Sequence, residues 1–245
     1  MCFPTKRTKN ALSDDDDKPT KAAVKPASTP APAPATITTT IPAMAPKIAI
    51  VIYSMYGHIA TLAETVKSGV EAAGGSATIY QIAETLSEDI LKLMHAPAKP
   101  AYPILAPADL PQFDAFLFGI PTRYGTMPAQ FKAFWDATGS LWAQGSLAGK
   151  YVSVFISTGT PGGGQEATAI GCLSTFVHHG MIFVPLGYSK TFGQLANLTE
   201  VRGGSPWGAG TFAGPDGSRS PSALELELAK LQGEHFYSVV SKVSF

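Results

Sequence analysis

Three short segments carry the residue types that bind small polar ligands, and each follows an apolar run of the sequence. The first, at 54–61, places small and hydroxyl-bearing residues directly before a helical pattern. Unpaired backbone N–H groups and the helix dipole at such a start suit a phosphate group. The segment contains no Lys or Arg, so neutral donors would hold the phosphate. Taken alone, it is better explained as an ordinary capped helix start.

The second segment, at 121–128, is bounded by two prolines. Its backbone amides and the Thr122 hydroxyl could meet the polar edge of a flat ring, with Arg123 or Tyr124 close to the ring face. A surface turn is the alternative interpretation.

The third segment, at 157–166, is rich in glycine but lacks the Gly-Lys-Ser/Thr ending of a P-loop. That absence disfavours ATP or GTP hydrolysis.

The surrounding pattern predicts how these segments are positioned. Near-continuous apolar runs are typical of strands buried on both faces of a parallel sheet. Their alternation with amphipathic stretches predicts an α/β fold with a doubly wound parallel sheet. Ligands bind at the carboxyl edge of such sheets, so we expect the three segments to form one mononucleotide site. The expected strands are 48–53, 77–82, 114–120, 151–156 and 181–184, and the expected helices are 59–73, 127–138, 166–179 and 221–243.

Two further stretches have distinct predicted properties. In the helix at 127–138, Phe131, Phe134 and Trp135 are spaced to share a buried face. A long Gly/Pro-rich segment at 187–220 interrupts the last strand–helix unit. Irregular segments of that length in a compact domain are usually functional or interfacial.

Composition excludes several classes of protein. Lys plus Arg and Asp plus Glu balance at 18 each, which disfavours nucleic acid as a partner. The two cysteines, Cys2 and Cys172, make a disulfide framework implausible and fit a reducing compartment. Cys172 is expected to be an inert buried thiol. We expect no metal site, no membrane span and no secretory signal, and hence a soluble cytoplasmic protein.

The N-terminal region differs from the rest of the chain. Residues 1–46 form a Pro/Ala/Thr-rich arm that we predict to be disordered, ahead of one domain at 47–245. Acylation of Cys2 beside the basic Lys6, Arg7 and Lys9 could supply the two signals that a stable membrane anchor requires. An unmodified terminus is the simpler interpretation.

Several motifs in the same order resemble those of the tryptophan-repressor-binding-protein-like (WrbA-type) quinone reductases, especially the fungal flavodoxin-like benzoquinone reductases. The resemblance runs from Lys47 to the C-terminus. One departure is Pro161, which looks like an insertion relative to the bacterial pattern. The motifs are SMYGHI at 54–59, PTRYG at 121–125, STGT at 157–160 with its Gly-rich run, HHGM at 178–181, EVRGG at 200–204 and DGSR at 216–219.

The resemblance implies a flavodoxin-like, FMN-binding domain with a five-stranded parallel sheet in the order 2-1-3-4-5 and helices on both faces. It implies an NAD(P)H:quinone oxidoreductase that uses NADH or NADPH and reduces quinones by two electrons in a ping-pong reaction. Homotetramers are typical of this family. The chemistry would be centred on the flavin, with no catalytic side chain. The alternatives are a one-electron flavodoxin carrier and a membrane-associated stress or structural protein that retains FMN.

The resemblance also assigns roles to individual residues. His178 would lie beside the flavin of a neighbouring subunit, although tandem histidines near a helix end are often only partners of the helix dipole. Trp142, in a predicted Gly-rich loop at 139–142, would shape the quinone pocket, with a core anchor as the alternative. Tyr56 would contact the nicotinamide. The FMN phosphate would bind to Ser54, Met55, Tyr56, Gly57, His58 and Ile59. The isoalloxazine ring would be bordered by Thr122, Arg123 and Tyr124. The pyrimidine edge of the ring and the ribityl chain would be held by Ser157, Thr158, Gly159, Thr160, Pro161 and Gly162.

Overall fold

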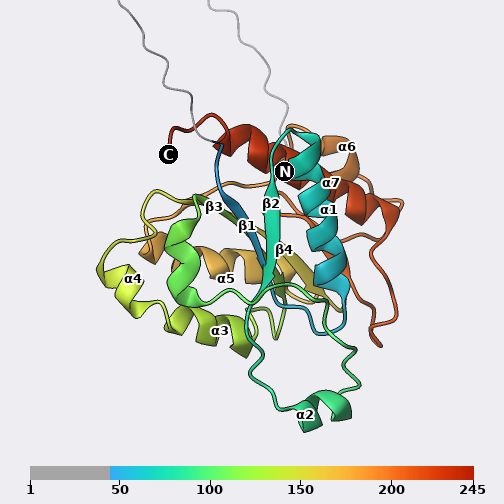
Figure 1. Cartoon of the computed structure of the whole chain (residues 1–245). Helices are drawn as coiled ribbons and strands as arrows, with labels where there is room; N and C mark the ends of the chain where they lie inside the picture. Colours follow the sequence, from blue (N-terminus) through green and yellow to red (C-terminus); the bar gives the residue numbers. More distant parts are fainter. Residues whose placement is uncertain (1–44) are drawn as a thin grey trace, which may run out of the picture. The chain divides into compact units, whose positions relative to one another are not determined.

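The computed structural model describes residues 45–245, so Cys2 and nearly all of the predicted arm lie outside the described residues. The described part is built from parallel strands that alternate with helices, as the sequence predicts (Figure 1). The strands are β1 (Ile48–Ile52), β2 (Ala77–Gln81), β3 (Ala115–Pro121), β4 (Tyr151–Thr158), β5 (Ile182–Phe183) and β6 (Gly210–Phe212). The helices are α1 (His58–Ala72), α2 (Glu88–Leu93), α3 (Ala129–Asp136), α4 (Gly139–Ala143), α5 (Gln165–His178), α6 (Phe192–Leu195) and α7 (Ala223–Val240), with a 3₁₀ helix, η1, at Pro107–Gln112.

The strand order β2-β1-β3-β4-β5 and the parallel pairing confirm the predicted flavodoxin-like sheet. The described part nevertheless has a sixth strand that the sequence analysis missed. β5 pairs only with the first residues of β4, and β6 pairs with its last three, from Ile156 to Thr158. The predicted strand at 181–184 is therefore shorter than expected, because the 187–220 segment returns to occupy the rest of that sheet edge.

Alternate strand residues face two helical layers. Ile48, Ile50 and Ile52 pack with α1 and α7, whereas Ala49 and Val51 belong to the core shared with α3 and α5. The backbones of α1 and α7 nearly touch, since a Cβ added to Gly233 would lie 2.0 Å from the Val66 carbonyl oxygen. Burial on both faces explains why these strands read as continuous apolar runs.

The core on the α3 and α5 side is aromatic. Phe118 stacks on Phe176 at 5.7 Å between ring centroids and meets Trp135 edge-on at 5.1 Å. Phe131, Phe134 and Trp135 are all buried, which confirms the predicted inner face of this helix.

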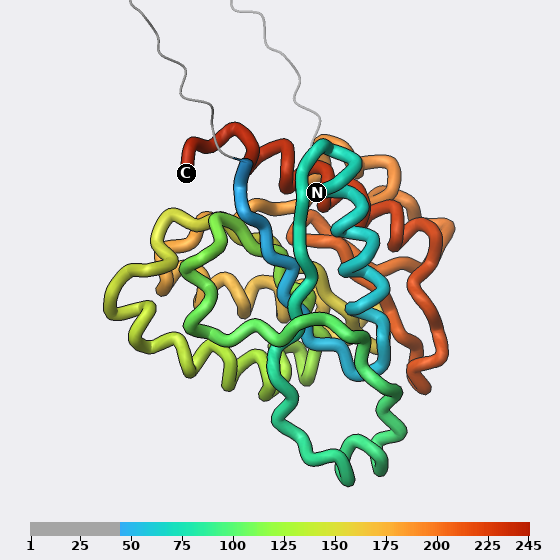
Figure 2. The backbone as a smooth tube through the Cα atoms, viewed as in Figure 1, coloured from blue at the N-terminus to red at the C-terminus, as the bar shows by residue number. Residues whose placement is uncertain are grey.

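The structure corrects several local predictions. The expected Gly-rich loop at 139–142 is the short helix α4. The last helix is shorter than 221–243 and begins after a capping box between Ser222 and Glu225. The segment at 83–106, which carries α2, loops away from the sheet at the bottom of Figure 2. Within residues 45–245, no helix combines the length and the apolar character that a membrane span requires.

Candidate functional site

The segments after β1, β3 and β4 meet at the carboxyl edge of the sheet and form one open cleft, as the sequence analysis predicts. The space within and at the mouth of the cleft amounts to about 410 Å³, open solvent included. Its lining residues are Ser54, Met55, Tyr56, His58, Ile59, Pro121, Thr122, Arg123, Ser157, Thr158, Gly159 and Ala213.

The first wall is the start of α1. Gly57 occupies the N-cap position in the left-handed conformation, with φ at 92° and no capping side chain. Ser54 Oγ accepts from the Ala60 amide at 3.3 Å, and the amides of His58 and Ile59 have no partner among the described residues. Unpaired donors at the positive end of a helix dipole fit an anionic phosphate. Gly57 is needed here because other residues rarely adopt such a φ.

In the second wall, Thr122 is hydrogen-bonded to two neighbouring segments of the protein. Its amide donates to the Ser157 carbonyl at 2.8 Å. Its hydroxyl pairs with Thr168 Oγ1 at 2.9 Å, and the Thr168 hydroxyl itself donates to Gly164. Thr122 therefore lines the cleft with its amide and its hydroxyl both in hydrogen bonds within the protein. The neighbouring guanidinium of Arg123 donates back to the Thr122 carbonyl at 2.9 Å.

Tyr124 lies at the tip of a tight turn rather than in the cleft. Both Tyr124 and Gly125 have positive φ, at 54° and 76°. The turn is closed by two hydrogen bonds between Arg123 and Thr126, at 2.8 and 3.0 Å. The Tyr124 ring is fully exposed, so this chain alone does not place it against a ligand in the cleft.

The third wall is formed by the end of β4. Ser157 and Thr158 belong to the strand, and Gly159 follows it. Thr160, Pro161 and Gly162, which the resemblance assigns to the cofactor, do not line the cleft. The Gly-rich run instead lets this wall pack against the second one, since a Cβ on Gly164 would lie 2.7 Å from the Gly125 Cα.

Two lining residues, Pro121 and Ala213, were missing from the predicted set. Ala213 comes from the 187–220 segment and donates its amide to the Thr158 carbonyl at 2.8 Å. The adjacent Gly214 amide donates to Gly159 at 2.9 Å. Only the unusual length and Gly/Pro content of the segment signalled its role, and neither property identifies the residue that reaches the cleft.

His178 and Trp142 lie away from the cleft of their own chain. α5 begins beside the cleft and ends with His178 near the opposite edge, where β5 pairs with the start of β4. Trp142, in α4, is 58% exposed. Thr138, just before α4, and His179, just after α5, share a hydrogen bond of 2.9 Å. Burial, together with the neighbouring His178, lowers the pKa of His179.

Beside the first wall, two side chains connect the cleft to the segment that carries α2. The Tyr56 hydroxyl donates to the Met94 carbonyl at 3.2 Å, while the Tyr56 side chain remains largely exposed. The Tyr53 hydroxyl donates to Glu84 at 3.0 Å. Burial and the Glu84 carboxylate raise the pKa of Tyr53, which keeps this phenol neutral.

Comparison with known proteins agrees with this geometry. The family model for NADPH-dependent FMN reductases matches residues 46–191, more than half of the chain. The NAD(P)H quinone oxidoreductase PST3 of Candida albicans is 66% identical over 199 residues, which cover 81% of this chain and 100% of that protein. Protoplast secreted protein 2 of Saccharomyces cerevisiae is 60% identical, over 80% of this chain and 99% of its own length. A flavodoxin-like, WrbA-like protein from Agrobacterium tumefaciens superposes with a TM-score of 0.57 at 25% identity, covering 81% and 99% of the two chains.

The sheet order and the cleft at its carboxyl edge define a flavodoxin-like protein. The chain belongs to the NADPH-dependent FMN reductase family, with WrbA-like and fungal relatives. The resemblance inferred from the motifs is therefore confirmed.

Proposed function

We propose that this protein is an FMN-containing NAD(P)H:quinone oxidoreductase. The observation that carries the proposal is the cleft itself, which is open and lies at the carboxyl edge. Two amides at the start of α1 have no hydrogen-bond partner within residues 45–245. The high identity to a quinone oxidoreductase over the whole of that protein supports the same activity. The overall reaction converts NAD(P)H, a proton and a quinone into NAD(P)⁺ and a hydroquinone.

The residues of the cleft fit FMN. The amides of His58 and Ile59 would hold the phosphate, and the end of β4 from Ser157 to Gly159 would border the ribityl chain and ring. Bound FMN would supply the two-electron redox chemistry that no side chain provides. The chain's own residues would bind, orient and shield it. Tyr56, with its exposed ring anchored to Met94, is a candidate contact for the nicotinamide.

The test is an absorbance spectrum of the purified protein before and after anaerobic NADH or NADPH. We expect flavin bands that bleach with the reduced nucleotide and return when benzoquinone is added. Steady-state lines for the two substrates should be parallel, because one cleft serves both in turn. A yellow protein that neither nucleotide bleaches would instead support a one-electron flavodoxin carrier.

We also propose that the active unit is a homo-oligomer, and specifically a tetramer. His178 and Trp142 are exposed and distant from the cleft of their own chain, so they could reach a flavin or quinone only in another copy. The outer face of α5 exposes Ile170 and Val177, which suits a contact between copies. A His178→Ala chain and a cleft variant such as Ser157→Trp are mixed as the test. Activity should return if His178 of one copy completes the cleft of another, and none should return if each chain works alone.

For location we propose the cytoplasm, with attachment to the plasma membrane through acylated Cys2 as the second candidate. The basic residues next to Cys2 in the sequence motivate the second candidate. Cell fractionation of wild type and Cys2→Ser distinguishes the two. An identical distribution of both chains removes the anchor.

A further inference from the structure

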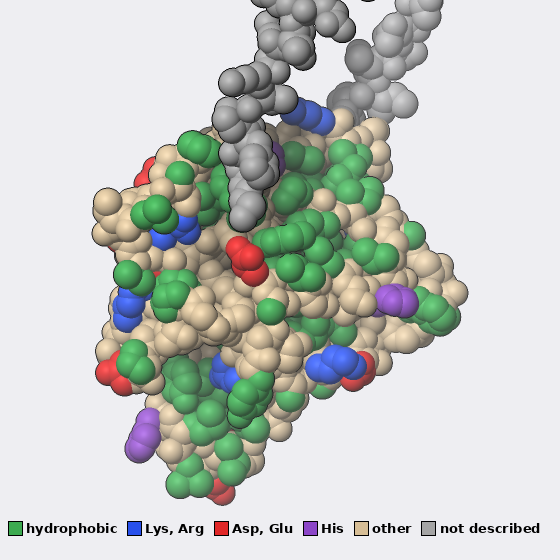
Figure 3. All heavy atoms as spheres, turned by 180° about the vertical axis from the view of Figure 1, so that it is seen from behind, with side chains coloured by type: hydrophobic (Ala, Val, Ile, Leu, Met, Phe, Trp, Pro, Cys, Tyr) green, Lys and Arg blue, Asp and Glu red, His purple; other side chains and the backbone are tan. Residues whose placement is uncertain are grey.

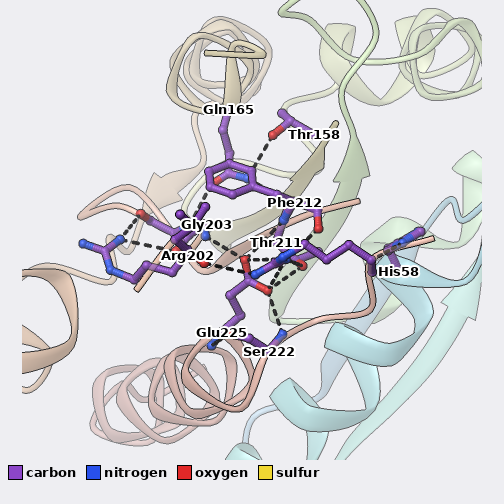
Figure 4. Close-up of polar contacts among 12 residues, drawn as sticks. His58, Thr158, Gln165, Arg202, Gly203, Thr211, Phe212, Ser222 and Glu225 are labelled. Carbon is purple, nitrogen blue, oxygen red and sulfur yellow. Dashed lines mark hydrogen bonds and ion pairs between the residues drawn. The ribbon is translucent and has the colours of Figure 1, made fainter. Parts of the chain in front are cut away.

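A fully buried carboxylate lies behind the third wall of the cleft. Glu225, in the first turn of α7, is 0% exposed. Its oxygens accept from the backbone amides of Gly203 at 2.7 Å, Ser222 at 2.8 Å and Phe212 at 3.2 Å, and from the Thr211 hydroxyl at 2.8 Å. Figure 4 shows these donors converging on one side chain from both ends of the 200–222 stretch. A buried charge of this kind persists only because it is paired and hydrogen-bonded.

The cation that pairs with this carboxylate is Arg219. Its Nη1 lies 2.9 and 3.1 Å from the two Glu225 oxygens and donates to the Phe212 carbonyl at 2.6 Å. Its Nη2 donates to the Val201 carbonyl at 3.1 Å, and its backbone amide donates to the Ala213 carbonyl at 2.9 Å. The ion pair therefore closes the loop at 213–219 and fixes the position of its last residue.

That loop contacts the cleft at two places. At one end, Ala213 pairs with Thr158 and lines the cleft. At the other end, the Arg219 carbonyl accepts from His58 Nε2 at 2.9 Å. A carbonyl can only accept, so His58 carries its proton on Nε2. His58 is the first residue of α1, and its amide is one of the unpartnered donors.

We infer that the Glu225–Arg219 ion pair positions the phosphate end of the cleft, by holding the Arg219 carbonyl against His58 and thereby fixing the first turn of α1. The inference rests on the proposed function only in taking FMN as the ligand. Arg219 and Glu225 are positioning residues, because neither lines the cleft. The contact supports the phosphate end alone, so its loss should weaken FMN binding and leave riboflavin, which lacks the phosphate, nearly unaffected.

The test compares the Kd values of FMN and riboflavin for the full-length apoprotein, measured by quenching of flavin fluorescence. For Arg219→Met we expect FMN to bind about tenfold more weakly, with riboflavin changed less than about twofold. The matched control is Arg202→Met. Arg202 is a half-buried guanidinium of the same segment that donates to the carbonyls of Gln194 and Gly204 and not to the cleft. The control should destabilise the segment without changing the ratio of the two Kd values.

A double-mutant cycle tests whether Arg219 acts through His58. His58→Ala alone should reproduce the loss of FMN affinity, and the double variant should lose no more than either single one. Equal weakening of FMN and riboflavin, the same effect in Arg202→Met, or additive losses in the cycle would overturn the inference. If Arg219→Met does not fold, Arg219→Gln, which removes the charge but can still donate a hydrogen bond to Glu225, gives the same comparison. A wild-type protein that binds no flavin would refute the proposed function itself, and an unchanged ratio in a flavin-binding protein refutes only this inference.

Discussion

Two long segments leave the sheet of this protein, and a glutamate with several hydrogen-bond donors contacts each of them. The segment at 83–106 is held by Glu84, which accepts from Tyr53, Gln130 and Lys99. The segment at 187–220 is held by Glu225 from α7. The donors to Glu225 are mainly backbone amides and a paired arginine. Glu84 accepts hydrogen bonds from three side chains and from the amides of the next two residues, Thr85 and Leu86. The side chain of Glu84 is 17% exposed and that of Glu225 is 0% exposed.

The two segments also differ in how closely they pack against the sheet. The segment around Glu225 is drawn into the sheet as β6 and lines the cleft through Ala213. The segment around Glu84 meets the sheet only near its end, where Ile104 forms an isolated bridge with Gln81, and none of the residues of α2 is buried. Its Leu93 is 75% exposed, and hydrophobic side chains gather over this protruding part at the bottom of Figure 3. The backbone amides that Glu225 binds include Gly203 and Phe212, 22 and 13 positions away in the sequence. Those that Glu84 binds belong to the next two residues, so only Glu225 ties distant parts of the backbone together.

The largest expected effect is that of Glu225→Gln. The amide nitrogen of glutamine would face N–H and O–H donors that now point at carboxylate oxygens. We expect a loss of about 3–5 kcal/mol in the free energy of unfolding, because a buried partner is removed and Arg219 is left unpaired. Urea unfolding monitored by circular dichroism measures it. A loss below about 1 kcal/mol would show that Glu225 is no more important than an exposed carboxylate.

A smaller effect is expected for Glu84→Gln. Its partners are partly solvated and can turn to water, so the free energy of unfolding should fall by about 1–2 kcal/mol. Glu88→Gln, at an exposed position in the same segment, is the control and should change it by less than about 0.5 kcal/mol. Within the domain at 47–245, limited proteolysis should also cut the Glu84 variant first between residues 83 and 106. Preferential cutting within 187–220 would show instead that Glu84 matters more to that segment than to its own, which contradicts the prediction.

The smallest expected effect is a change with pH in how much Glu84 contributes to the free energy of unfolding. Burial alone would raise the pKa of Glu84, but the ion pair with Lys99 and the amides of Leu86 and Thr85 hold it below the ordinary value. A lowered pKa gives stability that is present above the unfolded value of about 4.3 and is lost as the pH falls through the folded value. The stability difference between wild type and Glu84→Gln should therefore be constant from pH 7 to 5 and shrink below about pH 4. Urea midpoints across that range measure it, and a constant difference down to pH 3 would contradict the prediction.

The regular part of the fold was predictable because its signals are local. The strands at 48–52, 115–121 and 151–158 are buried on both faces and read as continuous apolar runs. Most of the cleft followed from them, since parallel strands bring their carboxyl ends to one edge. The use of Thr122 was not predictable, because its hydroxyl meets Thr168 from a helix 46 residues further along the chain. The outward position of the Tyr124 ring depends on a left-handed turn that the sequence pattern does not distinguish from other turns.

By itself, the sequence determined the alternation of strands and helices, the strand order implied by its resemblance, and the first and third walls of the cleft. Periodicity and residue type carry that information within a few neighbouring positions. Long-range packing, by contrast, explains why β6 completes the sheet edge, why Ala213 joins the cleft and how Glu225 and Arg219 connect to His58. Those contacts join residues 161 positions apart in one case, and a hydrogen bond across such a separation leaves no periodic pattern in the sequence.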